Sequence, residues 1–200
     1  MAAITISRQL GSLGTDVAQA AARRLGYRVV WRELINQAAL QAGLPEMALA
    51  TIDELGLLGL HPSAQARLAY HEAVRRVLEG LAAEGNVVIV GRAGQVILMD
   101  RPDVLHVKVI APALMRTMRV ARQQSISLEA AQAQVQASDR ARRNYLRRYY
   151  HARWDDPELY DLIINTARLS PEPAADLICQ ALTHILQTQK RGNHEQKELS

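Results

Sequence analysis

A short glycine-containing loop near the start of the chain has residues that could hold a phosphate group. Gly11 and Gly14 flank Ser12 just before an apolar pattern with helical spacing. Glycine lets the backbone approach an anion closely, and the first N–H groups of a helix attract one. Arg8, at the start of the loop, could add a planar, permanently charged set of donors. The loop therefore predicts a phosphate site, although an ordinary turn between a strand and a helix also uses glycines.

Thr15 and Asp16 follow this loop, in the first turn of the expected helix. Hydroxyl and carboxylate oxygens suit Mg²⁺, and the same side chains commonly cap helices. Capping is the more frequent use at this position, but the residues alone leave both interpretations open.

Arginines are concentrated at two further places. Arg92 follows the continuous apolar run 86–90, where it could either contact a ligand or face solvent. Residues 139–153 contain six arginines, and helical spacing puts Asp139 and Arg142 near one face. This stretch could be a lid that closes over phosphates, a solvated helix with its tyrosines packed inward, or a nucleic-acid-binding patch.

The composition restricts how phosphates could be bound. Lysine and arginine together number 24, but only Lys108, Lys190 and Lys197 are lysines. The P-loop motif G-x-x-x-x-G-K-[ST] requires a lysine, and none of the three lies in the glycine-containing loop. A phosphate site in this chain must therefore use arginines, backbone N–H groups, or both.

Short apolar runs alternate with helical patterns along the whole chain. Strands are expected at residues 3–7, 28–30, 86–90, 105–110 and 161–165, and helices at 15–25, 32–41, 64–84, 112–124, 128–150 and 171–187. This order predicts an α/β fold, with a parallel sheet of about five strands in three layers and helices on both faces. Residues 43–63 are expected to be a connecting excursion. Ligands of such sheets bind beyond the carboxyl ends of the strands, where the loops described above lie.

Composition also excludes several classes of protein. Aromatic residues are 4% and phenylalanine is absent, which argues against nucleic acid stacked on aromatic rings. No apolar run reaches the roughly 18 residues of a membrane span, the N-terminus lacks a signal-peptide pattern, and one cysteine makes no disulfide framework. We expect a cytoplasmic protein with small-molecule partners and no membrane contact. Its oligomeric state stays open, a homo-oligomer included.

Five short motifs together resemble a known family. They are Ile4–Gly14 (ITISRQLGSLG), Arg32–Ile35 (RELI), Val88–Arg92 (VIVGR), Asp139–Arg142 (DRAR) and Tyr160–Thr166 (YDLIINT). Their order and spacing are similar to those of the cytidylate kinase-like family, a divergent branch of the bacterial cytidylate kinases with the P-loop nucleoside-monophosphate kinase fold. The resemblance covers about residues 3–187. It implies one domain over residues 1–188, with an arginine-rich lid at about 112–155 and a flexible tail at 189–200.

The resemblance also implies transfer of a phosphoryl group from ATP to a nucleoside monophosphate or a similar small acceptor, with Mg²⁺. The implied ATP-binding residues are Arg8, Gly11, Ser12, Gly14 and Thr15. Asp16 would act on the metal ion. Clustered arginines suit such a reaction, because the protein mainly positions the groups and neutralises their charge.

On the acceptor side and in the lid, the resemblance assigns roles to five more residues. Arg92 matches the arginine that holds the acceptor nucleotide. Arg116 and Arg119 match the arginines that open the lid helix. Asp139 and Arg142 match the acidic and basic pair of the lid, and these four lid residues are the expected catalytic set.

The chain also departs from the pattern of the kinases. Gly14 stands where the P-loop lysine would be, and Arg8 stands at the first P-loop glycine. Leu13 replaces a loop glycine and could crowd a phosphate, while Trp31 and Ala93 replace two acceptor-side aspartates. A catalytically silent nucleotide-binding or regulatory module with the same fold is therefore the alternative function. A basic nucleic-acid binder is a third, less favoured hypothesis.

Overall fold

The structure is a computed structural model that describes residues 2–41 and 64–198. Its elements in chain order are β1 (Ala3–Arg8), α1 (Gly14–Leu25), β2 (Arg28–Val30), α2 (Arg32–Gln41), α4 (Ala64–Glu84), β3 (Val87–Val90), α5 (Gly94–Ile97), β4 (Val104–Ile110), α6 (Ala113–Gln124), α7 (Leu128–Tyr150), the 3₁₀ turn η1 (Pro157–Leu159), β5 (Leu162–Asn165) and α8 (Pro171–Glu198). The excursion expected at residues 43–63 lies outside the described residues.

The described strands form one sheet of five strands in the order β2-β3-β1-β4-β5. Every neighbouring pair is parallel, with Ile6 of β1 opposite Val90 of β3 and Val107 of β4. The predicted parallel α/β sheet is confirmed. Because β1 lies between β3 and β4, the loops that follow these three strands meet at one edge of the sheet.

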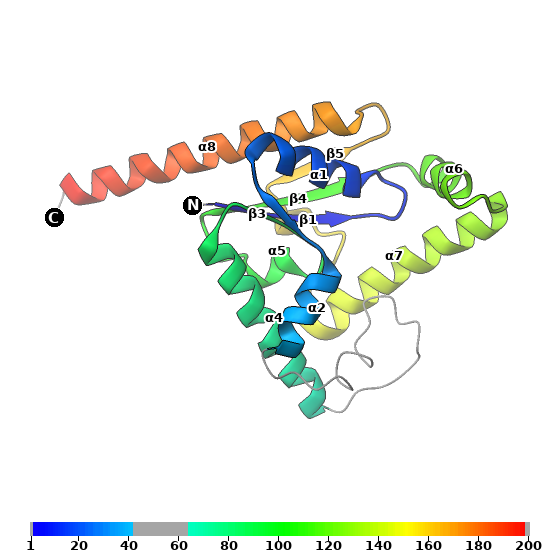
Figure 1. The fold of residues 1–200 in the computed structure, drawn as a ribbon, viewed down its shortest axis with the longest axis horizontal. Helices are drawn as coiled ribbons and strands as arrows, with labels where there is room; N and C mark the ends of the chain where they lie inside the picture. The colour runs from blue at the N-terminus through cyan, green and yellow to red at the C-terminus, as the bar shows by residue number, and fades with distance from the viewer. Residues whose placement is uncertain (1, 42–63, 199–200) are drawn as a thin grey trace.

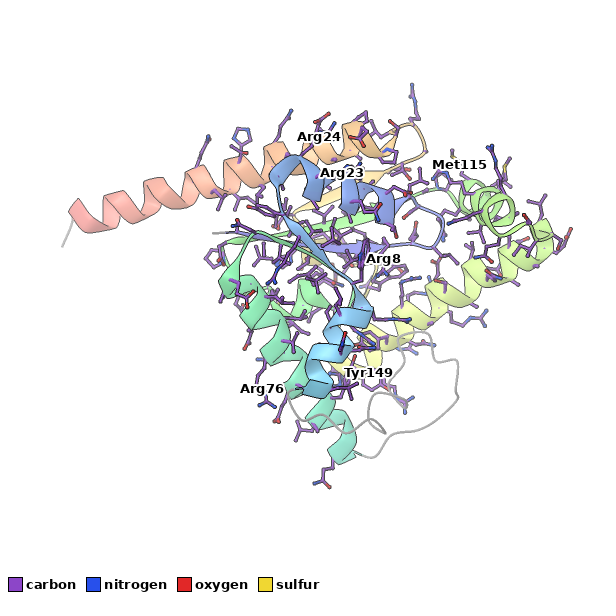
Figure 2. All side chains as sticks on the ribbon, in the orientation of Figure 1. Arg8, Arg23, Arg24, Arg76, Met115 and Tyr149 are labelled. Carbon is purple, nitrogen blue, oxygen red and sulfur yellow. The ribbon has the colours of Figure 1, made fainter. Side chains whose placement is uncertain are left out.

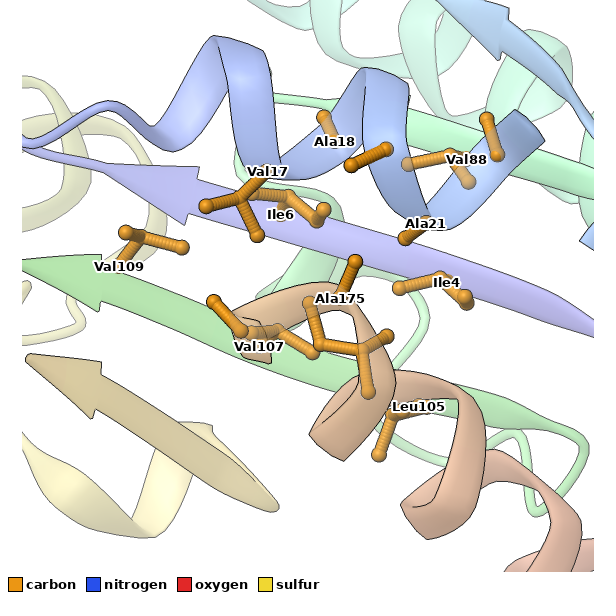
Figure 3. Close-up of a cluster of buried hydrophobic side chains, with 14 of the residues drawn as sticks. Ile4, Ile6, Val17, Ala18, Ala21, Val88, Leu105, Val107, Val109 and Ala175 are labelled. Carbon is orange, nitrogen blue, oxygen red and sulfur yellow. The ribbon is translucent and has the colours of Figure 1, made fainter. Parts of the chain in front are cut away.

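Helices α1 and α8 cover one face of this sheet (Figure 1). Alternate residues of β1, such as Ile4 and Ile6, point into this layer and pack against Val17 and Ala21 of α1 and Ala175 of α8 (Figure 3). The small alanines let the helices approach the strands closely. Exposed ion pairs of Arg23 and Arg24, labelled in Figure 2, with Glu172 and Asp176 also join α1 to α8.

The opposite face of the sheet is covered by α2, α4, α5 and α7. Ala3 and Ile89 from the strands pack there with Tyr70 of α4, Leu146 of α7 and Trp154 of the following loop. Helix α6 and the start of α7 stand away from the sheet (Figure 1) and share a small core of their own. These two helices form the part of the molecule where the lid was expected.

Two helices differ from the expectation. Helix α8 does not end near Gln187 but continues to Glu198. Helix α5 was not predicted, since its four residues follow a turn in which Gly91, Arg92 and Ala93 all have positive φ. Within the described residues, every helix is too short or too polar to cross a membrane.

Candidate phosphate-binding site

The glycine-containing loop joins β1 to α1 at the carboxyl edge of the sheet. Gly11 (φ 78°) and Leu13 (φ 60°) both have left-handed backbone, and α1 begins at the next residue, Gly14. A Cβ atom at position 11 would lie 2.6 Å from the carbonyl oxygen of Arg116 in α6. Gly11 is therefore required by its conformation and by the close approach of α6, a reason that the sequence does not show.

The carbonyl groups of this loop are held by the rest of the protein. The Gln9 carbonyl accepts from the Ser12 hydroxyl at 2.9 Å, and the Ser12 carbonyl accepts from Thr166 Oγ1 at 2.7 Å. Between them, the Leu10 carbonyl accepts from Arg116 at 3.4 Å and the Gly11 carbonyl from Arg119 at 3.2 Å. Because each oxygen has a donor, the peptide planes of the loop are fixed.

Several N–H groups of the same loop are left available, although that of Ser12 donates to the Gln9 carbonyl at 3.2 Å. In the described part of the chain, those of Gly11, Leu13, Gly14, Thr15 and Asp16 have no acceptor. The loop borders a cavity of about 290 Å³, whose lining also includes Arg8, Arg119, Arg142 and two glutamines of α6. A helix N-terminus with free N–H groups and three arginines around one cavity can bind an anion with several charges, such as a chain of phosphates.

The three arginines at the cavity come from three different elements. Arg8 ends β1, and its guanidinium has no hydrogen-bond or ion-pair partner among the described residues. Arg119 of α6 donates to the Thr166 backbone carbonyl at 2.8 Å as well as to Gly11. Arg142 of α7 is buried, bonds to the Ser138 hydroxyl and lies 6.0 Å from the ring centre of Trp154.

Arg116 and Asp139 lie beside the cavity rather than on its lining. Both are buried, and the guanidinium donates to the two carboxylate oxygens at 3.1 and 2.8 Å. Arg116 also donates to the backbone carbonyl of Ala111 at 3.0 Å. Through these bonds and its bond to Leu10, Arg116 connects the glycine-containing loop, the start of α6 and α7.

Arg92 is not a solvated arginine, because it is only 1% exposed. It donates to the Asn36 side chain of α2 at 2.6 Å and lies 5.6 Å from the ring centre of Tyr70. The left-handed turn after β3 directs it under α2, on the opposite face of the sheet from α1. The interpretation that it faces solvent is wrong.

Thr15 and Asp16 are exposed at the mouth of the cavity. The capping interpretation is wrong for both, because Leu13 occupies the cap position and its side chain makes no capping hydrogen bond. Among the described residues, no three histidine, cysteine or acidic side chains gather closely enough to hold a metal ion alone. One carboxylate and one hydroxyl still fit Mg²⁺, which commonly takes most of its ligands from water and substrate phosphates.

The arginine-rich stretch 139–153 divides between two environments. Arg142 is buried at the cavity, and Tyr145 packs inward as expected for a helix with one apolar face. The other five arginines are exposed: Arg140, Arg143, Arg147, Arg148 and Arg153.

A buried polar layer beneath the site was not anticipated. Trp154 donates from its ring to the Ser7 hydroxyl at 2.9 Å, and its carbonyl accepts from Lys108 Nζ at 2.7 Å. Burial lowers the pKa of Lys108, and the nearby Asp155 carboxylate offsets part of this effect. Lys108 therefore bonds to Trp154 and Asp155 below the sheet edge and does not line the cavity. Asp156 caps the following 3₁₀ turn by accepting from the Glu158 N–H at 3.2 Å.

Comparisons with known proteins agree with this geometry. The family model of the cytidylate kinase-like family matches residues 3–168. Cytidylate kinase from Pyrococcus horikoshii is 32% identical over 198 residues, which cover 98% of this chain and 96% of that protein. The fold is similar to an uncharacterized protein from Eubacterium ventriosum (TM-score 0.72, 22% identity, 92% and 98% coverage) and to shikimate kinase from Acinetobacter baumannii (TM-score 0.52, 13% identity, 92% and 94% coverage).

The family match and the curated relatives, on a parallel sheet with a glycine-containing loop after its central strand, support a kinase-type phosphotransferase. The chain belongs to the cytidylate kinase-like family. Membership in a kinase family implies the use of ATP and, typically, of Mg²⁺.

Proposed function

We propose that this chain transfers a phosphoryl group from ATP to a nucleoside monophosphate or a similar small acceptor. One observation carries the proposal: the loop after β1 has its carbonyls held by the protein and several of its N–H groups without an acceptor among the described residues, beside an arginine-lined cavity. Such preorganised donors stabilise phosphate charge without rearranging during the reaction. Positioning and charge neutralisation are what a phosphoryl-transfer enzyme chiefly provides.

On the donor side, the backbone N–H groups of Gly11, Gly14 and Thr15 would hold the phosphates of ATP, with Ser12 shaping the loop through its hydroxyl. Arg8 would contribute a cation that has no protein partner among the described residues. Arg142 would approach from the lid helix α7 and neutralise the transferring group.

For the metal ion, the Asp16 carboxylate and the Thr15 hydroxyl are the fitting ligands, directly or through water. Bound Mg²⁺ would neutralise charge on the phosphate oxygens. Both side chains lie on the first turn of α1, so the same loop would orient the phosphates and the ion.

We assign Arg116 a positioning role in place of the catalytic role expected from the sequence, and we assign Asp139 the orientation of that arginine. Their buried ion pair holds α7, and with it Arg142, in register with the phosphate loop. Arg119 has a similar role, because its donors already reach Gly11 and Thr166. We propose that residues 112–155 act as the lid of a single domain, moving about this connection.

On the acceptor side, Arg92 is the residue proposed to hold the acceptor phosphate. Its hydrogen bond to Asn36 places it against α2, the last described helix before residue 42. The bond to Asn36 uses one of the five N–H donors of the guanidinium. An acceptor phosphate could therefore bind other donors of Arg92 without displacing Asn36.

The alternative, a nucleotide-binding module without catalysis, is favoured by two residues. Gly14 removes the loop lysine, and Ala93 removes a carboxylate beside Arg92. Both proposals predict nucleotide binding, and only the first predicts a product.

The test has two steps. A thermal-shift panel of nucleoside triphosphates, with and without Mg²⁺, measures binding; a ligand at 100 times its Kd should add roughly 2.7 kcal/mol of stability. Formation of ADP and of nucleoside diphosphates from ATP and each monophosphate then measures transfer. Arg142→Ala should lower transfer, whereas Arg140→Ala, an exposed arginine on the same helix, should not.

Absence of a shift with every triphosphate would overturn the proposed function. A clear shift with no product from any acceptor would favour the binding module.

A further inference from the structure

The glycine at position 14 is not required by its own backbone. Gly14 opens α1 and is absent from the residues with positive φ, so other amino acids can adopt its conformation. In a helix, alanine is generally preferred to glycine. The reason for glycine must therefore be a neighbouring group.

That neighbour is Arg8. A Cβ atom built on Gly14 would lie 2.4 Å from the Cβ of Arg8 and 3.0 Å from its Cγ. The position of a Cβ atom is set by the backbone, so a change of rotamer at Arg8 cannot relieve the first contact. In this backbone, positions 8 and 14 cannot both carry a side chain.

The P-loop motif G-x-x-x-x-G-K-[ST] also has only one side chain at these two positions, but at the other one. Aligned on Thr15, its first glycine falls at Arg8 and its lysine at Gly14. The motif thus leaves position 8 empty and places a cation at position 14. This chain places the cation at position 8 and leaves position 14 empty.

We propose that Arg8 and Gly14 are a reciprocally exchanged pair, in which Arg8 supplies from the end of β1 the phosphate-binding cation that a lysine would supply from the start of α1. The stem of Arg8 lies over Gly14, Arg8 lines the cavity, and its guanidinium has no protein partner in the described part of the chain. Figure 2 shows Arg8 where β1 runs into the loop, beneath the start of α1. The ligand class is a chain of phosphates, and the charge assignment rests on the proposed function.

An arginine in this place differs chemically from a lysine. Its planar fork can donate two parallel hydrogen bonds to one phosphate group, whereas an ammonium acts as a point charge. Gly14 is the condition for this arrangement, because any Cβ there pushes the stem of Arg8 away.

The steric part can be tested without any nucleotide. Gly14→Ala should lower the melting temperature by several degrees in the natural chain. In the background of Arg8→Gly, the same change should be neutral or stabilising, because the remaining neighbour, Ser12 Oγ at 3.4 Å, is at ordinary contact distance. An equal loss in both backgrounds would contradict the claim that positions 8 and 14 cannot both carry a side chain. This measurement does not depend on nucleotide binding.

The charge part is tested by titrating ATP. Arg8→Gly should weaken binding at least tenfold, and the double variant Arg8→Gly/Gly14→Lys should recover most of that loss. The exposed Arg122→Ala on α6 serves as the control and should bind ATP as the natural chain does.

Unchanged ATP affinity in Arg8→Gly would overturn the exchange while leaving the proposed function intact. Failure of the double variant to recover affinity, although it folds with a normal melting temperature, would overturn it too. Absence of ATP binding in the natural chain would instead refute the proposed function.

Discussion

The guanidinium of Arg116 faces the carboxylate of Asp139 with both pairs of atoms in hydrogen-bond distance, 3.1 and 2.8 Å, inside the protein. The two residues are 23 positions apart, at the start of α6 and midway along α7. The same guanidinium reaches the carbonyl of Leu10. One buried ion pair therefore connects α6 and α7 beside the loop that follows β1.

Breaking this pair should be strongly destabilising. Asp139→Asn leaves the buried Arg116 charge without its partner, which commonly costs about 3–5 kcal/mol. Glu172→Gln, which removes the exposed ion pairs of Glu172 with Arg23 and Arg24, should cost less than about 1 kcal/mol for each pair. Urea unfolding of both variants gives the comparison, and equal losses would contradict the role given to the Arg116–Asp139 pair.

Gly11→Ala should separate steric from conformational effects in the loop. The new Cβ would meet the Arg116 carbonyl at 2.6 Å in a backbone with φ of 78°, so both effects oppose it. Gly26→Ala is the matched control, because φ is 66° there and nothing lies within 4 Å. We expect a loss of about 1 kcal/mol for the control from left-handed strain. Gly11→Ala should lose clearly more stability than the control. A similar loss in both variants would show that α6 can move away from the new Cβ at little cost.

Leu13→Gly should stabilise the loop. Leu13 adopts φ of 60°, a left-handed conformation that costs a residue with a side chain about 1–2 kcal/mol and costs glycine little. Leu13→Ala is the control, since it removes the side chain but keeps the strain. Thermal unfolding should rank the glycine variant above the alanine variant. An ATP titration of both would then show whether the leucine side chain crowds the phosphates.

Stability should fall as the pH drops below about 6.5 because of His106. Burial lowers the pKa of this histidine below its ordinary value of 6.5, so the folded state keeps it neutral while the unfolded state gains a proton. Its contribution is complete above pH 6.5 and is lost as the pH falls through the lowered pKa. The slope from one such group is at most about 1.4 kcal/mol per pH unit.

His106→Gln provides the test of that pH dependence. Glutamine can still meet the Thr5 hydroxyl, to which the histidine ring is hydrogen-bonded at 2.7 Å. Denaturant unfolding at pH 5 and pH 7 should differ less in this variant than in the natural chain. The same difference in both proteins would assign the effect to other groups.

Strand and helix positions were largely predictable because they depend on local patterns. The apolar run ending at Val90 and the helical spacing of residues 64–84 each specify an element without reference to distant residues. Helix α5 was not predicted, because it follows a left-handed turn at Arg92 and Ala93, and these residue types do not indicate such a turn.

The sequence by itself determined the class of fold, the loops that meet at the sheet edge, and the absence of a lysine from the phosphate loop. Alternation of strands and helices is a local property, and so is the residue at a motif position. Tertiary structure alone decided the tasks of individual residues, because these depend on contacts between distant parts of the chain. Gly11 is glycine because α6 approaches it, Arg116 is bound to Asp139, and Gly14 lies under the stem of Arg8.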